Sequence, residues 1–256
     1  MGIEMKPYYR PLSLESYAYL LKKASDKARV LAGGSYLLES TEAKKGEVLI
    51  DLQALKLDQV RYEGDEVHIG GLCNLNMLML ACSSMPDLVE VVRHQAGSHV
   101  RNTLSLANFL QTARIGQSSP LLCALMALNA RIVPILESNP VSLADLYLKD
   151  LPIPLAAELI LTRSADFSFG QVGRSEMDLP QVSMGITRLN DKEMRVAIDA
   201  GKLFVFEGSK ELAASFIKEL GPKLSDQWAG GEYRHNTLLV LLDRLIEAGP
   251  ERKETR

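Results

Sequence analysis

The stretch Gly33-Gly34-Ser35 combines residue types that can hold a phosphate group, and it lies between two apolar segments. Glycines let the backbone approach a ligand closely, consecutive N–H groups can form an anion-binding nest, and the serine hydroxyl adds a donor. The spacing matches neither the dinucleotide-binding G-x-G-x-x-G pattern nor the P-loop. Taken alone, the stretch favours a structural turn over a phosphate site.

A second group of donors lies in SHVRNTLSLAN, residues 98–108. Arg101, Asn102, Thr103, Ser105 and Asn108 give this short segment an unusual density of polar side chains for a connector. The alternative is a surface loop whose side chains cap nearby helix ends, and on this segment alone the alternative is slightly favoured.

Other kinds of site have little support. His94 and His99 are five residues apart, so they do not share a helical face as metal ligands would. No G-x-S-x-G elbow and no Cys-x-x-Cys pair occurs, and the three cysteines argue against a disulfide framework or an iron–sulfur cluster held by this chain. The net charge of −3 with dispersed Lys and Arg argues against nucleic-acid binding. We therefore expect no metal in this chain and no catalytic side chain of its own.

The elements around these residues follow from apolar spacing and from Gly and Pro breaks. Between the two polar stretches we expect helices and short buried strands, and residues 98–119 read as a loop. The predicted helices are 13–25, 74–97 with a break at 83–86, 120–130, 209–220 and 231–247. The predicted strands are VLAGG (30–34), 48–52, 65–71, 131–136, 158–162, 177–189 and 194–200.

The length of 256 residues with 46% hydrophobic residues favours a large domain followed by a smaller one. We place the boundary near residue 168, where the pattern changes. The first residues resemble no signal peptide and no run of about 18 apolar residues occurs, so we expect a cytoplasmic protein without membrane insertion. The last six residues, ERKETR, read as a frayed tail.

The order of these pieces closely resembles a known family. An A-G-G-S loop, IDL, a strand that ends in I-G, H-V-R-N and a P-x-L-x-A-L-x-A-L helix follow one another as in the FAD-binding (medium) subunit of molybdenum hydroxylases. These are the enzymes of the xanthine dehydrogenase and carbon monoxide dehydrogenase type. GQVGRSEMDLPQVSMGI (170–186) and EYRHNTLLVLLDRL (232–245) extend the resemblance over nearly the whole chain.

The resemblance implies an α+β protein. Residues 1–168 would form a two-part FAD-binding domain of the vanillyl-alcohol-oxidase type, with subdomains of about 1–55 and 56–168. Residues 169–256 would form the smaller α+β C-terminal domain. In this family the two loops close on the FAD pyrophosphate from opposite sides. The residues implied to bind FAD are Leu31, Ala32, Gly33, Gly34, Ser35, Tyr36, Arg101, Asn102, Ser105, Leu106, Ala107, Asn108, Gln117 and Leu161.

The sequence departs from the family pattern at several of these positions. Tyr36 stands where relatives usually have Asp or Glu, and the Gly-Gly-Asn of the second loop has become Ala107-Asn108, one residue short. Gln117 replaces an acidic residue that contacts the ribose, and Gly170 falls where some members carry a lysine near the flavin. Losing a glycine from such a loop adds strain as well as lost contacts.

The resemblance implies an electron-transfer oxidoreductase subunit that does not act alone. A molybdopterin subunit would pass electrons to a 2Fe–2S subunit, and FAD would receive them from there. FAD would then pass them to an acceptor such as NAD⁺. Family assemblies suggest a dimer of heterotrimers. The departures motivate an alternative, a flavin-free paralogue kept as an interaction or assembly module of such a complex. A third and weaker reading is a flavoenzyme of the same fold that acts alone.

Overall fold

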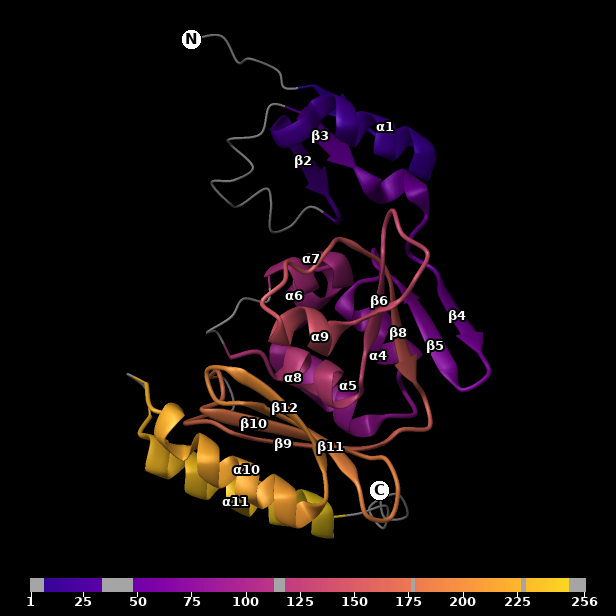
Figure 1. Cartoon of the computed structure of the whole chain (residues 1–256). Helices are drawn as coiled ribbons and strands as arrows, with labels where there is room; N and C mark the ends of the chain where they lie inside the picture. The colour runs from indigo at the N-terminus through magenta and orange to yellow at the C-terminus, as the bar shows by residue number, and fades with distance from the viewer. Residues whose placement is uncertain (1–6, 34–47, 113–117, 176–177, 227–228, 249–256) are drawn as a thin grey trace.

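The computed structural model describes residues 7–33, 48–112, 118–175, 178–226 and 229–248, and it consists of three parts that follow one another in space (Figure 1). The first part, which we call the N-terminal subdomain, contains a three-stranded parallel sheet of order β1-β3-β2. Its elements are β1 (Tyr8–Tyr9), α1 (Leu14–Ala24), η1 (Ser25–Lys27), β2 (Ala28–Leu31), β3 (Val48–Asp51) and η2 (Leu52–Leu55).

The start of α1 explains why the sequence predicts a helix that begins at Ser13. Ser13 is the N-cap, its hydroxyl accepts from the backbone N–H of Ser16 at 3.2 Å, and the Ser16 hydroxyl accepts from Ser13 in return. This reciprocal capping fixes the first turn. Tyr17 then packs against Ile50 and Leu52 in a small core beneath the helix.

The second part, the middle part, is a five-stranded antiparallel sheet of order β4-β5-β8-β6-β7, with helices on one face (Figure 1). Its core lies between that face and the helices. The strands are β4 (Val60–Glu63), β5 (Glu66–Gly70), β6 (Arg131–Pro134), β7 (Val141–Ser142) and β8 (Ala156–Thr162). The helices are α4 (Leu75–Ala81), α5 (Pro86–Gln95), α6 (Ser98–Thr103), α7 (Leu106–Thr112), α8 (Pro120–Ala127) and α9 (Leu143–Leu148).

The third part, the C-terminal part, is a four-stranded antiparallel sheet of order β12-β11-β10-β9. Helix α8 of the middle part covers one face, and α10 and α11 cover the other (Figure 1). The elements are β9 (Asp166–Val172), β10 (Val182–Arg188), β11 (Met194–Asp199), β12 (Leu203–Gly208), α10 (Lys210–Leu220), η3 (Gly221–Lys223) and α11 (Gly231–Glu247).

Most predicted elements are present, but the loop expected over 98–119 is wrong for its first part. Residues 98–103 and 106–112 form α6 and α7. The Thr103 hydroxyl donates back to the carbonyl of His99 at 3.2 Å, so a residue that suggested a loop serves the helix instead. Leu106, Phe109 and Leu110 keep helical spacing and are buried.

One predicted helix end also differs. The helix expected over 120–130 ends at Ala127, because Asn129 adopts a left-handed conformation with a φ of +51°. The change of sheet between β8 and β9 occurs at residues 163–165, so residue 168 lies inside β9. The predicted ERKETR tail lies outside the described residues. No helix in the described ranges has both the length and the hydropathy that a membrane span needs.

Candidate cofactor site

The first predicted loop begins where β2 ends, and it closes against the second loop. Leu31 is the last residue of β2, Ala32 is 1% exposed, and Gly33 has a φ of +92°. Glycine adopts this φ without strain, so the turn itself requires Gly33. A Cβ at Gly33 would lie 3.2 Å from the Oγ of Ser105. The described end of the first loop therefore lies directly against the second loop.

Ser105 joins these loops through its hydroxyl. Its side chain is buried, its Oγ donates to the carbonyl of Ala32, and it accepts from the backbone N–H of Asn108 at 3.2 Å. We call Ala32, Ser105 and Asn108 the clasp. The Ser105 hydrogen is thus directed at a backbone carbonyl rather than toward a ligand.

Asn108 carries an unused donor at the same place. The residue is 3% exposed, and its Nδ2 has no hydrogen-bond partner within the described part of the chain. An amide buried without a partner costs about 1–3 kcal/mol. A bound acceptor, such as a phosphate or ring oxygen, would satisfy it. The described residues therefore fit FAD at Asn108 and at the Gly33 turn.

Arg101 is directed elsewhere. Its Nη1 donates to the carbonyls of Ala96 at 2.6 Å and Arg93 at 3.1 Å, and its Nε donates to Oδ1 of Asn76 at 3.2 Å. The guanidinium thus binds the end of α5, where cations are favoured by the helix dipole. The predicted role of Arg101 at the cofactor has no geometric support here.

Asn102 faces α4 rather than the first loop. Its Oδ1 accepts from the amide of Asn76, and its backbone carbonyl accepts from Nδ2 of Asn74 at 3.0 Å. Asn74 is itself the N-cap of α4, with Oδ1 accepting from Met77 N at 2.9 Å. The polar density that marked residues 98–108 therefore partly serves helix ends, which was the alternative interpretation of this segment.

The backbone donors of the second loop are also engaged. Leu106 N donates to Cys73 O at 2.9 Å, and Ala107 N donates to Gly71 O at 2.8 Å. Ala107 packs with Ala32 in the core of the N-terminal subdomain. Since the Asn108 N–H binds Ser105, residues 106–108 leave no backbone N–H for an anion nest. The described donor at this loop is the Asn108 side chain.

The remaining predicted positions lie elsewhere. Leu161 is buried in the core of the middle part, opposite Val67 in the sheet, and is not brought to the loops. Gly34, Ser35, Tyr36 and Gln117 lie outside the described residues. A side chain at Gly170 would point at Leu241, 3.1 Å from its Cδ2, so a lysine there would meet α11 rather than the clasp.

Gly70 and Gly71 support the site and were not singled out from the sequence. Gly71 N donates to Ala157 O at 2.6 Å, while Gly71 O accepts from Ala107. A Cβ at Gly71 would lie 1.9 Å from the carbonyl oxygen of Ala156, and one at Gly70 would lie 2.2 Å from that of Leu57. The signal was present as the glycine pair at the end of the strand predicted over 65–71, which indicates close backbone approach.

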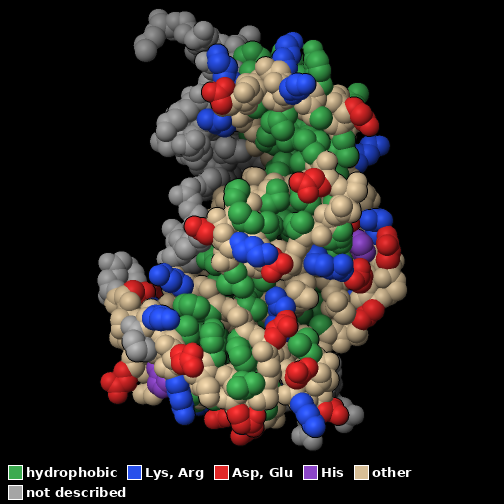
Figure 2. Space-filling model, viewed as in Figure 1, with side chains coloured by type: hydrophobic (Ala, Val, Ile, Leu, Met, Phe, Trp, Pro, Cys, Tyr) green, Lys and Arg blue, Asp and Glu red, His purple; other side chains and the backbone are tan. Residues whose placement is uncertain are grey.

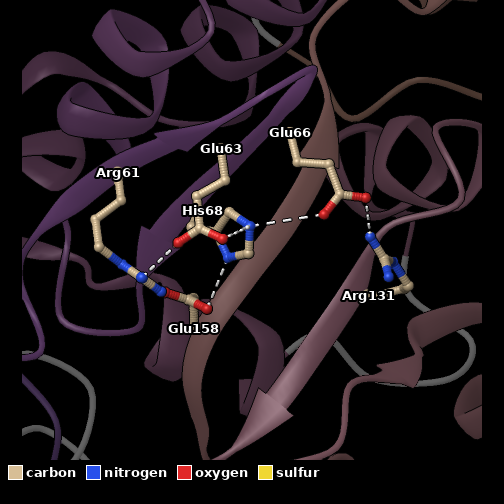
Figure 3. A network of polar contacts seen from close by, with 6 residues as sticks. All are labelled: Arg61, Glu63, Glu66, His68, Arg131 and Glu158. Carbon is tan, nitrogen blue, oxygen red and sulfur yellow. Dashed lines mark hydrogen bonds and ion pairs between the residues drawn. The ribbon is translucent and has the colours of Figure 1, made fainter.

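A charged network lies on the face of the middle sheet that is opposite to its helices (Figure 3). His68, which is 8% exposed, has Nδ1 3.0 Å from Oε2 of Glu158, and its Nε2 lies 3.6 Å from Glu66 and 3.8 Å from Glu63. The second oxygen of each carboxylate binds an arginine. Arg61 binds Glu63 and Glu158, and Arg131 binds Glu66. Within the described ranges no His, Cys, Asp or Glu group is arranged to hold a metal.

This network affects the ionisation of Glu158. Burial favours a higher pKa for Glu158, but the hydrogen bonds from Arg61 and His68 outweigh it and hold the pKa below its ordinary value. Each of the three carboxylates pairs with an arginine, so the network ties β4, β5, β6 and β8 together.

The cysteines are unsuited to nucleophilic chemistry. Cys73, Cys82 and Cys123 are buried and free. Burial raises the pKa of Cys73 to about 11 and that of Cys82 to about 12. The thiols therefore stay protonated near neutral pH, and the thiolate is the reactive form.

The chain is similar to known proteins in sequence and in fold. The chain is 28% identical over 196 residues to the uncharacterized protein YgfM of Escherichia coli (strain K12), covering 76% of this chain and 74% of that protein. It matches quinoline 2-oxidoreductase from Pseudomonas putida 86 with a TM-score of 0.75 and 20% identity, over 100% of both chains. Carbon monoxide dehydrogenase from Hydrogenophaga pseudoflava gives a TM-score of 0.72 and 20% identity, over 98% of this chain and 99% of that one.

At this identity the solved structures show the fold alone, and they confirm the expected α+β architecture. A family model described as "FAD binding domain in molybdopterin dehydrogenase" matches residues 3–162, which is more than half of the chain. The chain therefore belongs to the FAD-binding subunit family of the molybdenum hydroxylases.

Proposed function

We propose that this chain binds FAD between the N-terminal subdomain and the middle part, and that it works as the electron-transfer flavoprotein subunit of a molybdenum hydroxylase complex. The observation that carries the proposal is the buried and unpartnered amide of Asn108, beside the Gly33 turn. Two predicted cofactor loops converge there, in a chain of the FAD-binding family.

The described residues would act on the cofactor in two ways. Asn108 Nδ2 donates a hydrogen bond to a cofactor oxygen, which removes the cost of a buried unpaired donor. Gly33 keeps the first loop free of a Cβ beside the ligand. Leu31 and Ala32 hold that loop to β2, and Ala107 packs the second loop against Ala32.

Bound FAD would supply the redox chemistry, because flavins exchange one or two electrons. We infer that a 2Fe–2S subunit delivers the electrons, that a molybdopterin subunit oxidises the organic substrate, and that an acceptor such as NAD⁺ receives them. A dimer of heterotrimers and a cytoplasmic location stay predictions.

A second candidate is a flavin-free assembly module of such a complex. Arg101 and Ser105 favour it, because the structure directs both side chains at backbone carbonyls of the chain itself. The sequence departures at Tyr36 and Gln117 point the same way. This candidate predicts a stable subunit of the complex with no flavin absorbance near 450 nm.

Asn108→Leu tests the proposed function, because leucine is similar in size but lacks the amide. We expect the parent to bind FAD and Asn108→Leu to raise the Kd about 10-fold to 100-fold, the range of one lost hydrogen bond at a buried site. Without FAD the variant should be about 1 kcal/mol more stable, since the orphaned donor is gone. FAD fluorescence titration and urea unfolding measure the two effects.

Asn236→Leu is the matched control, because Asn236 is an exposed amide on α11. It should leave the Kd unchanged. Equal FAD affinity in the parent and in Asn108→Leu would refute the role of Asn108. A colourless copurified complex that cannot be reconstituted with FAD would favour the assembly module.

A further inference from the structure

A single hydroxyl group connects the two predicted FAD loops. Ser105 Oγ bonds the carbonyl of Ala32 in the first loop and the N–H of Asn108 in the second. The Ser105 backbone is held as well, since it forms an isolated β-bridge with Asn74. The hydroxyl thus sits at a fixed point from which both loops are positioned.

Counting hydrogen-bond capacity shows what this hydroxyl can still do. A serine hydroxyl has one hydrogen and two lone pairs. Ala32 takes the hydrogen and Asn108 uses one lone pair, so only an acceptor site remains. A phosphate oxygen needs a donor, and two acceptors do not bind one another. Ser105 therefore cannot serve the cofactor as the donor that its residue type suggested.

Space at the same point is restricted. A Cβ added at Gly33 would lie 3.2 Å from both Cβ and Oγ of Ser105, which is tighter than ordinary contact. The position of the Ser105 hydroxyl and the path of the Gly33 turn therefore constrain one another. Changing the hydroxyl changes where the first loop lies relative to Asn108.

We propose that Ser105 is a positioning residue for FAD: its hydroxyl fixes the first loop at the distance from Asn108 that the cofactor requires, without contacting the cofactor as a donor. The inference rests on the proposed FAD-binding function. It assigns the donor role at this loop to the Asn108 amide and the alignment role to Ser105.

Ser105→Ala tests the proposal because it removes the hydroxyl and leaves the Cβ. We expect the Kd for FAD to rise about tenfold, the effect of one hydrogen bond, and Ser105→Thr to restore it because threonine keeps the hydroxyl. Saturated Ser105→Ala should show a shifted visible circular dichroism band of the bound flavin, and Ser105→Thr should show the parental band. General loss of stability would not move the spectrum of the saturated protein.

Ser183→Ala is the matched control. Ser183 is fully buried like Ser105, but its Oγ has no hydrogen-bond partner within the described residues. We expect unchanged FAD affinity and an unchanged flavin band in this variant.

A double-mutant cycle shows whether Ser105 acts through Asn108. If it does, the tenfold effect of Ser105→Ala should shrink to less than threefold in an Asn108→Leu background, because coupled residues are not additive. Full additivity would place Ser105 in an independent role and overturn the proposal.

Hydrogen exchange separates this proposal from the proposed function. Without FAD, Ser105→Ala should speed hydrogen exchange at the backbone N–H of Asn108, which donates to the Ser105 hydroxyl in the parent. Exchange at the backbone N–H of Ala107 should not change, because that group donates to Gly71 O. If the parent binds FAD and Ser105→Ala binds it equally well, the positioning role is wrong while the function stands. If the parent binds no FAD, both are overturned, and the exchange data then report the clasp as a structural contact only.

Discussion

The middle part meets its two neighbours in different ways. Toward the N-terminal subdomain the contact is narrow: Ala107 and Ile135 join a small core there, and the clasp adds a hydroxyl bridge. Toward the C-terminal part the contact is broad, because all eight residues of α8 are buried. On the face shown in Figure 2, acidic and basic side chains are interspersed over all three parts, so charge alone does not distinguish the two junctions.

We call the second junction the α8 interface. Strand β11 holds both ends of α8: Asp199 accepts from Ser119 N at 2.6 Å at the start, and Arg195 Nε donates to Met126 O at 2.9 Å near the end. A negative group at the start of a helix and a positive one at its end complement the helix dipole. Gly185 of β10 then lets the sheet approach α8 closely.

The two junctions differ in how their polar groups are satisfied. The α8 interface is filled mainly by apolar side chains and pairs the polar groups at both helix ends, although Ser183 Oγ in β10 has no hydrogen-bond partner among the described residues. The clasp joins its loops through the Ser105 hydroxyl and leaves the Asn108 side-chain amide without a partner among the described residues. Under the proposed function, FAD bound at the clasp would supply the missing acceptor. The variants below test whether the two junctions differ in this way.

Gly185→Ala should have the largest effect on stability. A Cβ at this position would lie 2.7 Å from Cβ of Ala127 and 3.2 Å from the ring of Phe167. Ala127 cannot move without separating α8 from the sheet, so we expect a loss of about 3 kcal/mol in the free energy of unfolding, the upper range for overpacking. Urea unfolding followed by circular dichroism measures it.

Gly97→Ala is the control for Gly185→Ala, since a Cβ at Gly97 would meet nothing within 4 Å. It should change the free energy of unfolding by less than about 1 kcal/mol, as surface changes at a helix N-cap do. Similar losses in both variants would mean that α8 is not packed tightly against β10.

Asp199→Asn should have the second largest effect. The carboxylate accepts from Ser118 Oγ at 3.0 Å, Ser119 N at 2.6 Å and Gly201 N at 3.1 Å. An asparagine can replace one oxygen, but its NH₂ group then faces a donor. We expect a loss of about 1–2 kcal/mol, the cost of one unsatisfied buried group.

The pH dependence of the free energy of unfolding tests the contribution of Asp199 specifically. Burial raises the pKa of Asp199 above 3.8, and the hydrogen bonds from Ser119, Ser118 and Gly201 only partly oppose the shift. The folded state therefore binds this proton more tightly than the unfolded state, and its contribution to stability falls as pH rises above 3.8. The deficit of Asp199→Asn should accordingly shrink from acid toward neutral pH. A deficit that grows with pH would contradict the burial of this carboxylate.

Much of the fold followed from sequence pattern, because local signals and tertiary contacts agree there. Ser13 caps α1, a glycine pair ends β5, and the apolar run of α8 forms the buried helix that its composition indicates. The pattern failed at α6 and α7, where hydroxyl and amide groups that suggest loops instead bond helix ends. The need for Gly185 arises from α8, which is distant in sequence, so no local signal predicted it.

The location of the candidate site stays a prediction, and the contacts of its side chains did not follow from the sequence. Sequence order placed the Gly33 turn opposite residues 105–108, and the structure brings them together. Residue type indicates which atoms can donate, but only packing determines where they point. Arg101 points at the end of α5, Ser105 at Ala32, and Asn108 at no described partner. The roles of Arg101, Ser105 and Asn108 therefore required three-dimensional contacts.

Asp87→Ala should have the smallest effect of the three interface variants. Asp87 Oδ2 accepts from Phe169 N at 3.0 Å, at the outer edge of β9, and is only partly buried. Water can reach the freed N–H more easily than it can at Asp199, so we expect a loss of about 1 kcal/mol or less. Hydrogen exchange at Phe169 should speed up while the Ser119 amide stays protected. If both amides lost protection together, the α8 interface would open as one unit, and the separate contributions assigned to Asp87 and Asp199 would have to be abandoned.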